Sequence, residues 1–123
     1  MQTLIGVTIH PYGGTAVISV VGEIDISTVT QLEVEIETAM AAFGSAVVID
    51  LTETTFLDSR ALHLLIRTYR RCQGAGGQLR VVSPNFLATR IFQITGLNRS
   101  IAIFPTLEQA LWDAGDRLDP VAS

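Results

Sequence analysis

The chain has 123 residues, of which 48% are hydrophobic and 16% are charged. That length predicts one compact domain, and the apolar content excludes an intrinsically disordered chain. The formal net charge is −4, with eight arginines spread along the sequence and no lysine, so we expect no direct binding to nucleic acid. No signal-peptide pattern is present, and no apolar run approaches the ~20 residues that span a bilayer. We therefore expect a cytoplasmic protein with no membrane segment.

Cys72 is the single cysteine of the chain. It cannot form an internal disulfide, and no histidine or second cysteine stands at metal-ligand spacing from it. The sequence therefore predicts a small side chain packed toward the end of a helix, with no metal and no cofactor.

Two strands and a helix are predicted for the first third of the chain. Apolar residues alternate on both sides of a Pro-Tyr-Gly-Gly turn, which predicts an antiparallel pair of strands, the second over 16–21. We expect Gly22 to end that strand. Apolar residues at helical spacing then predict a helix over 29–43, with Asp25 or Ser27 as its N-cap.

A buried strand and a capped helix are predicted next. The apolar run at 46–51 predicts a strand buried on both faces, followed by a threonine-rich loop. Asp58 and Ser59 then precede a helix over 59–72, because a short polar side chain before helically spaced apolar residues is an N-cap signal. The remaining predicted elements are a turn at 73–77, a strand at 78–82, a helix at 84–95, a short strand at 101–104, a helix at 106–114 and a flexible tail at 115–123.

The order of these elements, β-β-α-β-α-β-α-β-α, defines the expected fold class. It predicts a single α/β domain with a mixed four- to five-stranded sheet and about four helices, its parallel part built by right-handed crossovers. Functional loops of such sheets lie at the carboxyl ends of the parallel strands. Asp58 and Ser59 follow the central strand and are expected at that edge.

Catalytic interpretations of Ser59 lack the residues that they need. A serine nucleophile needs a base, but His10 adjoins a turn, and we expect His63 to point along or into the packing surface of its helix. No G-x-S-x-G turn is present, and no glycine-rich turn leads from a strand into a helix. A phosphate-accepting receiver domain would need a lysine and an early acidic pair, which are missing. We therefore expect a binding module and no enzyme.

Five segments resemble, in order and spacing, the motifs of the STAS domain family, which includes the anti-sigma factor antagonists of bacteria. The segments are VVGEID at 20–25, DLTETTFLDSRAL at 50–62, GGQLRVVSP at 76–84, IFQITGL at 91–97 and IFPTLEQA at 103–110. Each motif alone is weak, but the resemblance spans about residues 4 to 112. It implies one STAS domain over 4–114, with 115–123 as the tail.

The resemblance implies a function and a site. It implies an anti-sigma factor antagonist. Such proteins bind an anti-sigma factor, which is typically also a serine kinase, and so release a sigma factor. Phosphorylation of the serine in the Asp-Ser pair, here Ser59, ends that binding, and a serine phosphatase restores it. The family arrangement places the loop after the second strand beside Ser59, as an acidic surface that contains glycine. The partner-binding residues so implied are Gly22, Glu23, Asp25, Asp58, Arg60, Ala61 and Leu62.

Two positions depart from the family pattern. Arg60 stands where the family usually has serine or threonine, and Ala61 stands where it usually has glycine. Both substitutions change the surface that a partner would contact. They keep a second interpretation open, in which a STAS-like module that is never phosphorylated serves a transport, lipid-handling or sensory complex.

Overall fold

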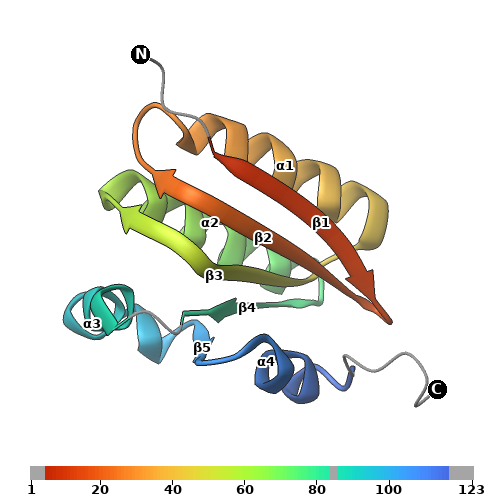
Figure 1. The fold of residues 1–123 in the computed structure, drawn as a ribbon. Helices are drawn as coiled ribbons and strands as arrows, with labels where there is room; N and C mark the ends of the chain where they lie inside the picture. Colours follow the sequence, from red (N-terminus) through yellow and green to blue (C-terminus); the bar gives the residue numbers. More distant parts are fainter. Residues whose placement is uncertain (1–4, 84–85, 117–123) are drawn as a thin grey trace.

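The chain forms a five-stranded sheet with helices on both faces (Figure 1). The computed structural model describes residues 5–83 and 86–116. The strands are β1 (Gly6–Tyr12), β2 (Thr15–Ile24), β3 (Ala46–Leu57), β4 (Gln78–Val82) and β5 (Ala102–Phe104). The helices are α1 (Val29–Phe43), α2 (Ser59–Gly74), α3 (Phe86–Thr95) and α4 (Leu107–Asp113), with a short 3₁₀ helix, η1 (Leu97–Arg99), before β5.

The sheet is mixed, with the strand order β1-β2-β3-β4-β5. β1 pairs antiparallel with β2, and the other neighbouring strands pair in parallel. The main core lies between the sheet and α1 and α2, whereas α4 packs Ala110 and Leu111 on the opposite face against Val17, Val48 and Val82. The predicted α/β class, mixed sheet and four helices are therefore confirmed for the described residues.

The central strand β3 is buried on both faces where the sequence predicts it. Val47, Val48 and Ile49 are all 0% exposed, although their side chains alternate between the two clusters of the core. A strand covered on both faces needs consecutive apolar residues, as in this run.

Two strands are longer than predicted, because they pair with each other beyond the expected ends. β2 continues through Gly22 to Ile24, and β3 continues through the threonine-rich segment to Leu57. Gly22 pairs with Thr54, whose buried hydroxyl donates to the Val20 carbonyl at 3.0 Å. Register shifts flank this pair, and Gly22 accommodates them with a φ of 114°. The predictions of a break at Gly22 and of a threonine-rich loop were therefore wrong.

The helix ends also differ in part from the predictions. Thr28 is the N-cap of α1, not Asp25 or Ser27, and α2 continues to Gly74. The predicted start of the third helix at residues 84–85 lies outside the described residues. Leu4 and residues 117–123 also lie outside them, so the proposed domain limits remain predictions.

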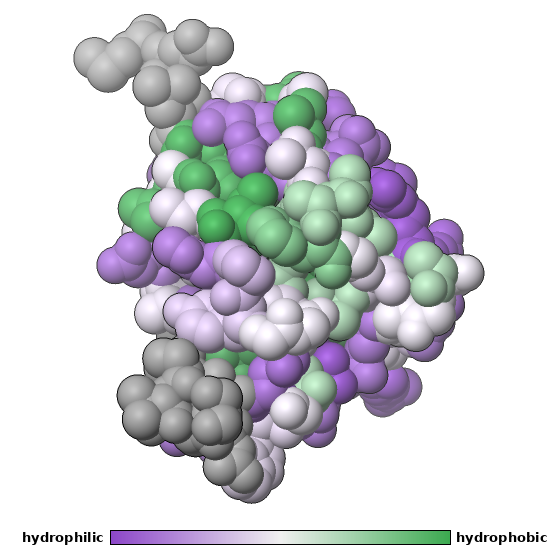
Figure 2. Space-filling view, turned by 90° about the vertical axis from the view of Figure 1, so that its right-hand side faces the viewer, coloured by the Kyte–Doolittle hydropathy of each residue, from purple (hydrophilic) through white to green (hydrophobic). Residues whose placement is uncertain are grey.

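The two ends of the parallel strands present different surfaces. Figure 2 looks onto the side where α1 ends and shows an apolar area bordered by hydrophilic side chains. Phe43, the last residue of α1, is 45% exposed. Near that end, Asp116 accepts hydrogen bonds from the Gly14 amide at 3.3 Å and from the Thr15 hydroxyl, so the chain after α4 is tied to the β1–β2 turn. Ser59 lies at the opposite end, where β2 and β3 terminate.

Candidate functional site

The segments that follow β2 and β3 lie side by side. Ile24 and Leu57 are paired residues at the ends of the two strands, and the Asp58 amide donates to the Ile24 carbonyl at 3.2 Å. Asp25 and Asp58, which come next in each segment, therefore occupy the same edge of the sheet. The structure thus brings the two predicted halves of the site together.

Asp58 caps α2, as the sequence predicts. Its carboxylate accepts hydrogen bonds from the Arg60 amide at 2.9 Å and from the Ala61 amide at 3.2 Å. These bonds satisfy donors that have no partner within the helix, and the negative charge lies at the positive end of the helix dipole. Ser59 is the first residue of the helix and is exposed.

Asp25 organises the turn that precedes α1. Its carboxylate accepts from the Ser27 amide at 2.9 Å and from the Ser27 hydroxyl at 2.6 Å. The hydrogen bond from the Ser27 hydroxyl is the main reason why the pKa of Asp25 is lowered. Thr28 closes the turn, because its hydroxyl donates to the Glu23 carbonyl at 2.7 Å. Asp25 is thus an ionised turn residue beside Asp58.

The predicted partner-binding residues differ in exposure. Glu23 and Arg60 are exposed, whereas Ala61 is 2% exposed and packs in the main core. The Ala61 side chain therefore supports the start of α2 from inside and is not at the surface. The partly exposed members of the set are Gly22, Asp25, Asp58 and Leu62.

Exposed apolar side chains at the same edge were missed by the sequence reasoning. Val21 is 47% exposed, Ile26 65% and Phe56 50%, and they are three of the seven large apolar residues that are exposed in the described part of the chain. Phe56 belongs to the extension of β3, which the sequence analysis took for a loop. Val21 lies in β2, three residues before its end, and Ile26 lies in the turn before α1.

Contrary to the prediction from the sequence, His63 does not point into the packing surface of α2. It is exposed, since the buried face of the helix consists of Ala61, Leu64, Leu65, Thr68 and Cys72. In the described residues no hydrogen bond joins His63 to Ser59. Cys72 is 0% exposed, and burial raises the pKa of its thiol to about 11.

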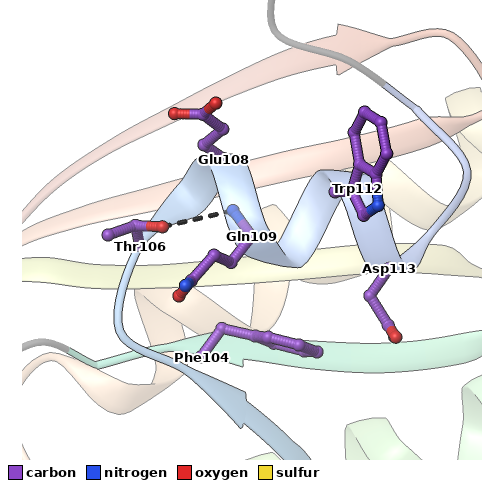
Figure 3. A pocket seen from close by; sticks show the side chains of 6 residues that line it. All are labelled: Phe104, Thr106, Glu108, Gln109, Trp112 and Asp113. Atoms are coloured by element: carbon purple, nitrogen blue, oxygen red, sulfur yellow. Dashed lines mark hydrogen bonds between the residues drawn. The ribbon is translucent and has the colours of Figure 1, made fainter.

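A wide hollow of about 710 Å³ lies beside α4. Its lining residues are Phe104, Thr106, Glu108, Gln109, Trp112 and Asp113. Figure 3 shows Gln109 and Asp113 on the Phe104 side of α4, and Glu108 and Trp112 on the other side, so the side chains do not converge on one point. The Asp113 carboxylate also pairs with Arg80 at 2.8 Å. This hollow lies on the α4 face of the sheet, away from α2.

Within residues 5–83 and 86–116, no cluster of histidine, cysteine, aspartate and glutamate could hold a metal ion. No helix there combines the length and apolarity that crossing a membrane requires.

The strand order and the flanking helices define an α/β domain with a mixed five-stranded sheet. The sequence profile of the STAS domain matches residues 7–110. The anti-sigma-F factor antagonist RsfB of Mycobacterium tuberculosis is 35% identical over 116 residues, which cover 94% of each chain. The anti-sigma-B factor antagonist of Listeria monocytogenes is 30% identical over 70% of this chain and 75% of its own.

A solved structure agrees with these relatives. The crystal structure of an anti-sigma factor antagonist from Mycobacterium paratuberculosis superposes with a TM-score of 0.84 at 35% identity, covering 91% of this chain and 95% of its own. The chain therefore belongs to the STAS domain family and, within it, to the anti-sigma factor antagonists. The resemblance seen in the sequence is confirmed.

Proposed function

We propose that the protein binds an anti-sigma factor through the edge around Ser59, and that phosphorylation of Ser59 ends this binding. Free of phosphate, the protein occupies the anti-sigma factor, and a sigma factor is released. The partner is an anti-sigma factor with serine kinase activity, and a serine phosphatase reverses the modification. The observation that carries the proposal is the exposed Ser59 at the start of α2, next to the point where the segments after β2 and β3 lie side by side.

The relatives support an antagonist over a STAS module of a transport, lipid-handling or sensory complex. The relative that covers 94% of this chain is named an anti-sigma-F factor antagonist. Such a protein acts in the cytoplasm by binding, without catalysis of its own. The two departures from the family pattern do not displace Ser59, because the Arg60 side chain is exposed and the Ala61 side chain faces the core.

The geometry supports a switch at the surface. A phosphate on Ser59 would add about −1.5 to −2 charges beside Asp58 and Asp25. The Arg60 and Ala61 amides, which could otherwise bind it, already bond the Asp58 carboxylate. The phosphate would therefore compete with Asp58 for these donors or remain at the outer surface. Either way the partner meets altered charge and shape, and the core needs no rearrangement.

The test uses the anti-sigma factors with a kinase domain from the same organism. Calorimetric titration of the wild-type protein should give binding to one of them, and incubation with ATP should place one phosphate on Ser59, as located by mass spectrometry. Ser59→Ala should bind and accept no phosphate, whereas Ser59→Glu should bind more weakly. Ser100→Ala, at another exposed serine, is the matched control. Full phosphorylation of Ser59→Ala, or no binding by the wild-type protein, would refute the proposal.

A further inference from the structure

The solvent-facing side of α2 carries a row of basic residues that follows Ser59 along the helix. His63, Arg67 and Arg70 follow Ser59 at intervals of three or four residues, so these four side chains share one face of the helix. All four are exposed. Arg60 and Arg71 flank the row, and we call Arg60, His63, Arg67, Arg70 and Arg71 the basic stripe.

The charge of this stripe is concentrated on one helix of an acidic protein. α2 contains four of the eight arginines of the chain and no acidic residue, although the net charge is −4. Arg70 stands 11 positions after Ser59, a distance of about 16 Å along the helix at the rise of 1.5 Å per residue. The stripe is therefore long enough to contact one face of a partner protein.

In the described residues, ion pairs neutralise only Arg67 and Arg71 of the stripe. Glu33 of α1 pairs with Arg67 at 2.8 Å, and Glu37 of α1 pairs with Arg71 at 3.5 Å. Both pairs are exposed, with side-chain exposures between 41% and 61%, so water weakens them. In the described residues no ion pair joins Arg60 or Arg70 to a carboxylate. Two positive charges of the stripe are thus left for a partner.

The domain gains little stability from this arrangement. Arg67 lies three residues before Arg70 and four before Arg71, so like charges are neighbours on the helix surface, which is unfavourable. Arg60 stands at the helix start, where the dipole disfavours positive charge. Arg70 and Arg71 do suit the dipole at the other end. Binding to a partner protein would explain all the arginines of the stripe, since arginine is enriched at the energetic centres of protein interfaces.

We propose that the basic stripe is the second part of the partner-binding surface and that it contacts an acidic face of the anti-sigma factor. This inference rests on the proposed function, and the stripe is continuous with Ser59. A partner protein can place acidic side chains against the arginines of the stripe and basic side chains against the neighbouring carboxylates. Nucleic acid or anionic lipid, in contrast, would be repelled by the carboxylates along α1 and at the start of α2, which belong to Glu33, Glu37, Glu23, Asp25 and Asp58.

The stripe also predicts how phosphorylation changes the electrostatic attraction to the partner. Ser59 shares the helix face of His63 and Arg70, so its phosphate would place negative charge at the head of the stripe. An acidic partner face would then lose attraction and meet repulsion at the same point. The effect should fade as salt screens the charges.

Charge reversal at Arg70 tests the inference. Arg70→Glu, about 16 Å along the helix from Ser59, should weaken binding to the anti-sigma factor about tenfold at roughly 50 mM salt and about threefold at roughly 300 mM. Arg99→Glu, an equal charge change at an exposed arginine of η1, is the matched control and should stay within about twofold. Equal affinities of the two variants would overturn the inference. Loss of wild-type binding would instead count against the proposed function.

A second measurement needs no anti-sigma factor. At low salt, fluorescence anisotropy should show a glutamate-rich helical peptide binding the wild-type protein and the Arg99→Glu variant more tightly than the Arg70→Glu variant. Duplex DNA and vesicles that contain anionic lipid serve as competing probes. Tighter binding of DNA or vesicles than of the peptide, lost in Arg70→Glu, would overturn the assignment of a protein partner. Equal peptide binding by both variants would overturn the role of the stripe.

Discussion

The cap of α2 can be tested by removing the Asp58 carboxylate. Asp58→Ala deletes the acceptor of two amide hydrogen bonds, at 2.9 Å from Arg60 and 3.2 Å from Ala61, and removes a negative charge from the helix start. Loss of an N-cap costs about 0.5–2 kcal/mol of the free energy of unfolding. Because both bonds end on a carboxylate that is only partly exposed, we expect about 1.5 kcal/mol, in the upper half of that range.

Thermal unfolding followed by circular dichroism measures this cost. For a domain of this size, 1 kcal/mol shifts the melting temperature by about 4 °C, so Asp58→Ala should melt about 6 °C lower. Asp58→Asn keeps an acceptor and loses only the charge, and it should cost about 0.3–1 kcal/mol. Urea unfolding with an unchanged slope would show that the native state alone is affected.

Two results would refute the reasoning about Asp58. An Asp58→Ala variant that melts within about 1 °C of the wild-type protein would mean that water replaces the cap at no cost. Equal destabilisation by Asp58→Asn and Asp58→Ala would mean that the charge matters and the acceptor geometry does not. Ser59→Ala, which leaves both bonds in place, is the control and should melt close to the wild-type protein.

Three further predictions concern single residues. Asp25→Asn keeps an acceptor for the Ser27 amide and should melt normally while binding the anti-sigma factor more weakly; unchanged titration would leave Asp25 a turn residue only. Arg60→Ser should reduce the difference in affinity for the anti-sigma factor between the unphosphorylated and the phosphorylated protein. An equal or larger difference in calorimetric titration would mean that Arg60 has no part in the switch. Native Cys72 should resist thiol reagents at pH 8, because burial raises its pKa from 9.0 to about 11. Since the folded state holds this proton more tightly than the unfolded state, stability should fall as the pH rises from 9 to 11. Rapid labelling of the native thiol at pH 8 would contradict the predicted resistance to thiol reagents.

Features that depend on neighbouring residues could be predicted from the sequence alone. Asp58 was identified as an N-cap because capping involves residues within three positions along the chain. The buried central strand followed from one apolar run, Val47 to Ile49, and the order of elements led to the α/β class. Ser59 was singled out because its segment matches a family motif.

Features that depend on residues far apart in the chain were decided only by the tertiary structure. Gly22 and Thr54 remain in strands because they pair with each other, and each segment alone favours a turn or loop. Arg67 meets Glu33, 34 positions away, only because α1 and α2 pack side by side. The packing of α2 in the main core buries Ala61 and leaves His63 and Arg70 exposed. The sequence therefore determines the helix start at Ser59, while the surface around it follows from which distant segments the sheet brings into contact.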